Sequence, residues 1–191
     1  MRDTVQEKPA GDHRSSDPSG QSLELSFATP ANAPVERQDF RDAMASLAAS
    51  VCIVSARDED ARAGRTVTAV MSLTGTPPSV LVSIDRESLL AGMIRHSATF
   101  SLAVLARSQW TIADAFAGRI AAAHRFKCGR WDSWPSGNPK LAHAVTAMDC
   151  AVIGQIVTET HILFAGAIVG IERSARLSPL IWHDRGYHSA D

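Results

Sequence analysis

Short hydroxyl side chains recur at even positions of one extended segment of this chain. Thr66, Thr68, Ser72 and Thr74 lie within an apolar run that the turn sequence Gly75-Thr76-Pro77-Pro78 follows. Successive side chains of a strand point to opposite faces, so a regular strand would place these four hydroxyls on one polar face. Such a row, beside accessible backbone amides, could hydrogen-bond the polar edge of a flat ring system and its phosphate. Threonine also favours strands for packing reasons alone, so both interpretations stay open at this point.

The common nucleotide-binding and hydrolytic motifs are absent from the sequence. It contains no G-x-G-x-x-G, no G-x-x-x-x-G-K-[ST], no H-E-x-x-H and no G-x-S-x-G. The three cysteines form no C-x-x-C pair, and His96, His124 and His143 show no metal-ligand spacing. We therefore expect no metal site, and a bound nucleotide would be held by strand-edge amides and hydroxyls.

Length, charge and cysteine content narrow the class of protein. A chain of 191 residues suits one large domain or two small ones. Lys and Arg number 19 and Asp and Glu number 20, so the net charge is −1, which argues against nucleic-acid binding and against a polybasic membrane surface. The N-terminus has no apolar signal segment, and no apolar run reads as a membrane span. With sparse, unpaired cysteines, the expected compartment is the cytoplasm.

The composition divides the chain at about residue 34. Residues 1–34 hold four of the nine prolines and many Ser, Asp and Gly residues, so we expect a disordered tail in which Ser22–Phe27 could form a short strand. Residues 35–191 read as a single domain.

Hydrophobic periodicity predicts a mainly β domain with flanking helices. Phe40, Met44 and Leu47 indicate a helix over residues 39–49 with Asp39 as its N-cap. Six runs rich in β-branched residues predict strands, and two segments have helical spacing. The predicted strands are 51–55, 66–73, 80–84, 100–105, 150–158 and 162–171, and the predicted helices are 88–96 and 108–117. This order favours a closed or nearly closed antiparallel barrel over a doubly wound parallel sheet.

Several ordered pieces of Phe40–Tyr187 resemble one known family. They are Phe40-Arg41-Asp42-Ala43-Met44, Val51–Ser55, Thr66-Val67-Thr68-Ala69-x-x-Ser72 with Pro77-Pro78, Val80–Ser88, Phe116-Ala117-Gly118 with Arg125-Phe126, His161–Gly166 and Pro179–Tyr187. The set is similar to the flavin reductase family with the FMN-binding split-barrel fold, the small reductase components of two-component flavin-dependent monooxygenases. The expected fold is accordingly an antiparallel split β-barrel.

The resemblance implies a set of cofactor-binding residues and no catalytic side chain. The flavin ring and ribityl chain would contact Thr66, Val67, Thr68, Ala69, Ser72, Leu73 and Thr74. The flavin phosphate would lie near Asp85, Arg86, Ser88 and Arg125, with Phe116 and Phe126 in the neighbouring motif. His161 would help to hold the nicotinamide cofactor, and His183, Arg185 and Tyr187 would form the other wall.

Each of these residues also has an ordinary structural interpretation. Ser88 suits the N-cap of the following helix, and Arg125 could be a solvated side chain. His161 could form hydrogen bonds to the backbone alone. His183, Arg185 and Tyr187 could belong to a frayed, polar C-terminal end of the chain. Trp131 and Trp134 could cover a flavin or simply hold their loop, and Asp114 is expected to be solvated.

The implied reaction is hydride transfer from NADH or NADPH to FMN, with FAD as a possible substitute. The cofactors supply the chemistry, and the protein supplies the slot and the orientation. The resemblance further implies a homodimer that passes reduced flavin to a partner monooxygenase. Glu159-Thr160 and Ala167 depart from the family pattern around His161 and leave the choice of nicotinamide cofactor open. The alternatives are a flavin-bound reductase of another acceptor, such as a corrinoid, and a non-enzymatic flavin- or haem-binding split barrel.

Overall fold

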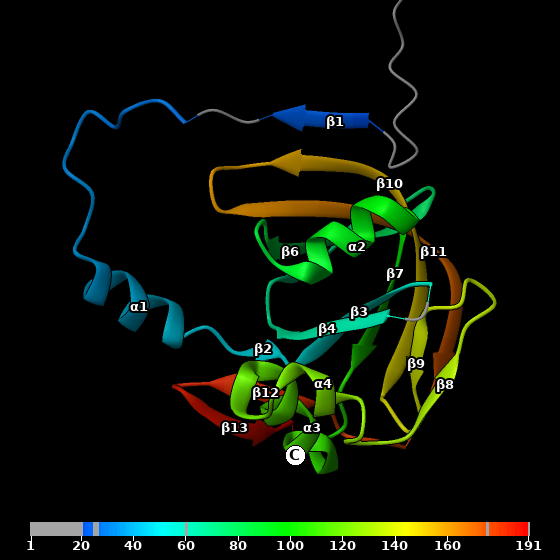
Figure 1. Cartoon of the computed structure of the whole chain (residues 1–191). Coiled ribbons are helices and arrows are strands. Elements are labelled where there is room, and N and C mark those ends of the chain that lie inside the picture. Colours follow the sequence, from blue (N-terminus) through cyan, green and yellow to red (C-terminus); the bar gives the residue numbers. More distant parts are fainter. Residues whose placement is uncertain (1–20, 25–26, 60, 175, 191) are drawn as a thin grey trace, which may run out of the picture.

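Seven strands lie side by side in one antiparallel sheet of the computed structural model, which describes residues 21–24, 27–59, 61–174 and 176–190 (Figure 1). Their order across the sheet is β4 (Ala61–Val67), β3 (Cys52–Asp58), β7 (Thr99–Val104), β10 (Thr146–Val157), β11 (His161–Arg173), β6 (Pro78–Asp85) and β5 (Val70–Gly75). An eighth strand, β1 (Gln21–Glu24), pairs in parallel with the second half of β10. Smaller sheets contain β2 (Ala49–Ser50), β12 (Leu180–His183) and β13 (Gly186–Ser189), and β8 (Trp131–Ser133) with β9 (Pro139–Leu141).

Short helices flank the main sheet. They are α1 (Arg37–Ala45), α2 (Leu89–Ser97), the 3-10 turn η1 (Arg107–Gln109), α3 (Trp110–Asp114), the π-helical turn η2 (Ala115–Arg119) and α4 (Ala122–Arg125). The sequence predicted α2 over 88–96, and its N-cap is Ser88, whose Oγ accepts a hydrogen bond from the Ala91 amide at 3.2 Å. The predicted helix 108–117 is a composite of η1, α3 and part of η2.

The main sheet is open between β4 and β5, although the chain passes directly from one to the other. Within the described residues no strand pairing joins these two strands, and Thr68 and Ala69 form the break between them. The carbonyls of Thr68 and Ala69 accept hydrogen bonds from the amides of Val70 (2.9 Å) and Ser83 (3.2 Å). The predicted split-barrel class is confirmed, and the closed form of the barrel is wrong.

The break also corrects the prediction of one hydroxyl-lined strand over residues 66–73. Thr66 belongs to β4, whereas Ser72 and Thr74 belong to β5, and the β5–β6 register shifts between those two residues. The alternation of side chains between the two faces is therefore interrupted twice, at the break and at this register shift. As a result, the four hydroxyls do not lie on one face.

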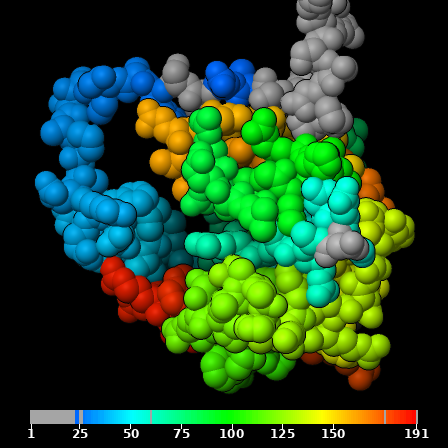
Figure 2. Space-filling view, in the orientation of Figure 1, coloured from blue at the N-terminus to red at the C-terminus, as the bar shows by residue number. Residues whose placement is uncertain are grey.

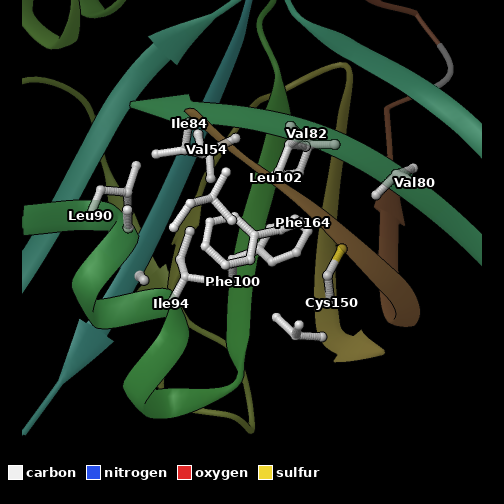
Figure 3. Packing of buried hydrophobic residues seen from close by; sticks show 14 of the residues in the cluster. Val54, Val80, Val82, Ile84, Leu90, Ile94, Phe100, Leu102, Cys150 and Phe164 are labelled. Atoms are coloured by element: carbon white, nitrogen blue, oxygen red, sulfur yellow. The ribbon is translucent and has the colours of Figure 1, made fainter. Parts of the chain in front are cut away.

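Two hydrophobic cores share strand β3, the neighbour of the edge strand β4. Cys52, Val54 and Ala56 face the core beneath α2, whereas Val51 and Ile53, before and within the strand, face a second core. Figure 3 shows Leu90 and Ile94 of α2 directed toward Phe100, with Phe164 close by. Burial on both faces explains why these strands read as continuous apolar runs rather than as alternating ones.

The loop around β8 and β9 is held to the sheet by polar contacts. Trp134 Nε1 donates to Ser101 Oγ at 3.1 Å, and Ser136 Oγ donates to the buried Asp149 carboxylate at 2.8 Å. Trp131 packs against the ring of Phe126. Of the two expected roles for these tryptophans, the structure supports holding the loop.

The N-terminal part departs most from expectation. Residues 1–20 and 25–26 of the expected tail lie outside the described residues, and Gln21–Glu24 forms a strand, in line with the alternative for Ser22–Phe27. Helix α1 spans Arg37–Ala45 with Glu36 as N-cap, rather than 39–49 with Asp39. Its apolar residues do not enter a core, because Phe40 is 55% exposed and Met44 is 46% exposed. We call residues 27–47, which include α1, the N-terminal arm. Figure 2 shows the arm beside the rest of the protein, with a hollow between them.

Gly64 of β4 should tolerate no side chain, because it lies directly beneath the fully buried Phe116 ring. A Cβ built on Gly64 would lie 2.7 Å from Phe116 Cε1. We expect Gly64→Ala to lower the free energy of unfolding by about 1–3 kcal/mol, as overpacking of a well-filled core does. Chemical denaturation followed by tryptophan fluorescence measures this change in the free energy of unfolding.

Gly92 of α2 provides the control for this substitution. A Cβ there would meet nothing within 4 Å, and alanine favours a helix interior. Gly92→Ala should stabilise the protein by up to about 1 kcal/mol. Equal unfolding curves for Gly64→Ala and the wild type would contradict the packing described above.

Candidate functional site

Three cavities follow one another along β4 and the break after it. We name each by one residue that lines it. The Arg125 cavity has a volume of about 250 Å³ and is lined by Arg62, Ala63, Gly64, Arg65, Ser88, Leu89, Leu90, Ala122, Arg125 and Phe126. The Tyr187 cavity, of about 230 Å³, is lined by Val51, Arg65, Thr66, Val67, Thr68, Ala117, Trp182 and Tyr187. The Thr68 cavity, of about 290 Å³, is lined by Thr68, Ala69, Val70, Met71, Leu81, Val82, Ser83 and Leu163.

The cavities are linked by shared residues. Arg65 lines both the Arg125 and the Tyr187 cavity, and Thr68 lines both the Tyr187 and the Thr68 cavity. From Arg62 to Ala69 the chain spans roughly 20 Å at the rise of an extended strand. The arrangement suits a long ligand with a different chemical group in each cavity.

Positive charge gathers in the Arg125 cavity. Arg62, Arg65 and Arg125 line it, and none of its lining residues is a carboxylate. Arg125 is held over β4 because its Nε donates to the Ile120 carbonyl at 3.2 Å and its Nη1 to the Gly64 carbonyl at 3.5 Å. Ser88 and the N-terminal residues of α2 close the cavity, and the positive end of a helix dipole favours an anion. The cavity can therefore bind a phosphate.

Ser88 is the predicted N-cap of α2 and also lies in the wall of the Arg125 cavity. Its Oγ caps α2 and donates to the Asp85 carbonyl at 2.6 Å, and the residue also lines the Arg125 cavity. Phe126 lines the cavity as well, with the Arg62 guanidinium 4.5 Å above its ring centroid. Arg62 was missed because only the β3–β4 hairpin brings it beside Arg125.

The break supplies free backbone donors at the junction of the other two cavities. Among the described residues, neither the Thr68 amide nor the Ala69 amide donates a hydrogen bond. Both residues are exposed. The Thr66 hydroxyl, by contrast, donates to the Ala113 carbonyl at 2.6 Å and so joins β4 to α3. At the break, the backbone amides of Thr68 and Ala69 are therefore free to bind a ligand, whereas the hydroxyl of Thr66 is already hydrogen-bonded within the protein.

Three of the predicted flavin contacts lie away from these cavities. Ser72 and Leu73 are exposed on β5, and the Thr74 hydroxyl accepts a hydrogen bond from the Thr76 amide at 3.1 Å, which holds the β5–β6 turn. Phe116 is fully buried against Gly64, so its ring is part of the second core rather than a wall of the site.

His161 lies at the far end of β11, opposite Asp85 of β6. Its Nδ1 is 2.9 Å from Thr160 Oγ1, and the imidazole is exposed. Arg86 reaches the same turn, where its Nη1 donates to the Thr158 carbonyl at 3.4 Å. Asp85, Arg86 and His161 thus gather where β6 ends and β11 begins, but none of them lines the three cavities.

The three predicted C-terminal residues point to different neighbours. Tyr187 lines the Tyr187 cavity and packs edge-on against Trp182 at 5.1 Å between ring centroids. Arg185 forms an ion pair with Asp42 of α1 and lowers the pKa of that carboxyl. His183 is exposed and lies edge-on to the ring of His188. Of the three, only Tyr187 lines a cavity.

Comparison with known proteins gives the family. Residues 44–191 match the family model described as "Flavin reductase like domain". The chain is 37% identical over 171 residues to "FMN reductase (NADH) RutF" of Serratia proteamaculans (strain 568), covering 88% of this chain and 97% of the relative. This chain belongs to the flavin reductase family.

Solved structures agree with the fold of a flavin reductase. YcdH from Haemophilus somnus 129PT, described as a flavin reductase, is 31% identical with a TM-score of 0.79, over 82% of this chain and 100% of that one. The styrene monooxygenase flavin reductase SMOB from Pseudomonas putida S12 is 23% identical with a TM-score of 0.71, over 80% of this chain and 97% of that one. At that identity the second likeness shows the fold alone.

Three further features of the described residues concern metal-ligating groups, membrane-spanning helices and thiol reactivity. The described residues contain no group of three or more His, Cys, Asp or Glu side chains that could hold a metal. No helix in the described part of the chain is long and apolar enough to cross a membrane. Burial raises the pKa values of the Cys52 and Cys150 thiols to about 12, so both stay protonated and unreactive at neutral pH.

Asp114 is a functional candidate for which the sequence predicted only a solvated role. It was expected to be solvated, yet its side chain is only 18% exposed and its Oδ1 accepts the Tyr187 hydroxyl at 2.9 Å. Arg119 Nε lies 3.4 Å from the same oxygen. Asp114 therefore fixes the tyrosine that forms one wall of the Tyr187 cavity, a contact between residues 73 positions apart.

The chain has one tyrosine, so its titration reports on this contact directly. Burial, together with the hydrogen bond and charge of Asp114, raises the pKa of Tyr187 to about 12. Asp114→Asn removes the negative charge that disfavours tyrosinate, so it should lower the pKa of Tyr187 toward 10, its ordinary value. Ultraviolet difference absorbance of tyrosinate measures the shift.

Asp132→Asn is the matched control, since Asp132 is exposed on β8. Its titration should superimpose on that of the wild type. An unchanged Tyr187 titration in Asp114→Asn would show that the carboxylate does not hold the phenol.

Proposed function

We propose that this flavin reductase binds FMN along the three linked cavities and reduces it with NADH. The observation that carries the proposal is the pair of unpartnered Thr68 and Ala69 amides, which the Tyr187 cavity links to a cavity lined by three arginines. The amides suit the polar edge of the flavin ring, and the arginines suit its phosphate. FMN and NADH are the cofactors that the name of the Serratia proteamaculans relative prints.

The donor set fits a monophosphate in the Arg125 cavity. Arg65 and Arg125 supply charge-assisted donors, and Ser88 with the N-terminus of α2 completes the cradle. Trp182 and Tyr187 on one side of the break, and the apolar lining of the Thr68 cavity on the other, would hold the flavin ring. Val67, Thr68 and Ala69 remain assigned to the ring, whereas Ser72, Leu73 and Thr74 are not.

A flavin held by these residues would supply the hydride-acceptor chemistry, with a nicotinamide as the donor. The protein's part is to hold both rings at contact distance and to limit the access of water. Asp114 and Trp182 fix the Tyr187 wall from two sides, so this surface is preorganised. No general acid or base is required in this step.

We assign nicotinamide recognition to the end of the sheet where β6 ends and β11 begins, which carries Arg86 and His161. Both side chains are exposed there, and the Arg86 amide donates to the Thr160 carbonyl at 3.0 Å, which fixes the turn. An imidazole and a guanidinium can donate to the phosphate or amide groups of NADH.

We further propose that the protein is a homodimer. Phe40, Met44 and Leu47 of the arm are exposed, as are Met71 and Leu73 on the edge strand β5. A monomer would leave these side chains and the unpaired edge of β5 in water. Light scattering should give twice the mass of the chain, and Phe40→Ser with Met44→Ser should shift the mass toward that of one chain. A wild-type protein that is monomeric at micromolar concentration would contradict the proposal.

Release of reduced flavin to a partner monooxygenase completes the proposed function. The site opens at the surface along β4, which suits a flavin that leaves after reduction. Cys52, Cys128 and Cys150 are all free thiols, which favours the cytoplasm as the compartment.

Anaerobic reduction of free flavin tests the proposed activity. Catalytic amounts of protein with excess FMN and NADH should bleach the yellow flavin with many turnovers. A protein that binds FMN but leaves it yellow would be a carrier or sensor, and the proposal would fail. Reduction of bound flavin without turnover of free FMN would point instead to another electron acceptor.

Binding titrations with FMN and riboflavin test the phosphate site through Arg125. FMN should bind more tightly than riboflavin, which lacks the phosphate. Arg125→Ala should weaken FMN binding about 10- to 100-fold, as expected for a lost charge-assisted hydrogen bond, and leave riboflavin binding nearly unchanged. Arg130→Ala, at an exposed position nearby in sequence, is the control and should preserve the preference. If Arg125→Ala weakened the binding of FMN and riboflavin equally, the phosphate would not bind in this cavity.

A further inference from the structure

A fourth cavity lies apart from the three that form the flavin site. It has a volume of about 420 Å³ and is lined by Ala106, Arg107, Ser108, Trp110, Arg176, Leu177 and Ser178. None of these residues lines the other three cavities. We propose that this Trp110 cavity is a docking site for an acidic segment of a partner protein.

The base of the Trp110 cavity is held by hydrogen bonds between distant segments. The Arg107 amide donates to the Ser178 carbonyl at 2.9 Å, and Ala106 forms a β-bridge with Pro179. Buried Gln109 accepts from the Ala106 amide and donates through Nε2 to the Ala142 carbonyl, both at 3.0 Å. The surface is therefore prepared before a partner arrives, which lowers the entropy cost of binding.

Two guanidinium groups give the cavity its charge. Arg107 and Arg176 are exposed, and neither side chain has an ion-pair or hydrogen-bond partner among the described residues. The cavity is lined by no carboxylate, although the whole chain carries a net charge of −1. This local positive potential favours carboxylates on the partner.

The apolar lining favours a protein segment over a free anion. Trp110 is 51% exposed and Leu177 is 37% exposed, so both present apolar surface beside the two arginines. Tryptophan and arginine dominate the energetics of protein interfaces. An apolar side chain of the partner would pack on Trp110 and Leu177 while neighbouring carboxylates pair with Arg107 and Arg176.

The position of the cavity places the partner close to the flavin site. Trp110 begins α3, and Asp114 ends it in contact with Tyr187 of the Tyr187 cavity. Those two residues are separated by only about one helical turn, or about 6 Å. Docking at the Trp110 cavity itself does not depend on flavin binding.

Fluorescence anisotropy with a labelled acidic peptide tests the proposal. The probe is rhodamine-DELDFEDL, and its matched neutral form is rhodamine-NQLNFQNL. We expect saturable binding of the acidic peptide that weakens as salt rises, and at least about tenfold weaker binding of the neutral peptide. Arg107→Ala with Arg176→Ala should weaken acidic-peptide binding about tenfold or more, and Trp110→Ala should weaken it as well.

Arg95→Ala, which removes a positive charge at an exposed position of α2, should leave peptide binding unchanged. FMN titrations of the Arg107→Ala/Arg176→Ala variant should match the wild type, which separates this proposal from that of the flavin site. Absence of saturable binding, or equal binding by the double variant, would overturn the proposal. Displacement of the peptide by succinate at the peptide's own dissociation constant would also overturn it, because the site would then serve small anions.

Discussion

The unpaired backbone between β4 and β5 is the constraint on which the site depends. An antiparallel sheet that nearly closes must either join its last two strands or leave their edges free. Here the chain runs straight from one edge strand to the other through Thr68 and Ala69, whose amides donate to no described group. The free amides of this edge need hydrogen-bond acceptors, and no neighbouring strand supplies them. A flat ligand with acceptors along one side can do so.

The rest of the fold places complementary groups around that edge. Burial of β3 on both faces puts one core beneath α2 and a second beneath η2, and β4 lies between α2 and η2 at the margin of the sheet. Helix α2 brings Ser88 to one end of β4, and the C-terminal hairpin brings Trp182 and Tyr187 to the other. Gly64, which Phe116 covers, lets the second core approach β4 closely enough for Arg125 to reach across the strand. Stability and site geometry therefore depend on the same packing.

The sequence was informative where local pattern and burial agree. The strands at 80–84, 100–105, 150–158 and 162–171 and the Ser88 cap were predicted because each depends on short-range periodicity or capping chemistry. The split-barrel class was implied by the family resemblance, whereas periodicity alone gave only an antiparallel barrel. The break at Thr68-Ala69 could not be predicted, since an unbroken apolar run gives no sign of which strand each half will join. Arg62 and Asp114 were missed because their roles come from partners far along the chain. Helix α1 has the spacing of a core helix, but its apolar side chains are exposed, and a second copy of the chain is our proposed partner for them.

A crystal structure of the protein soaked with FMN tests the central claim most directly. We predict that the flavin ring lies across the break, with its polar edge within hydrogen-bond distance of the Thr68 and Ala69 amides, and that its phosphate lies beside Arg125 and Ser88. A flavin bound elsewhere, with both amides still facing solvent, would contradict the account.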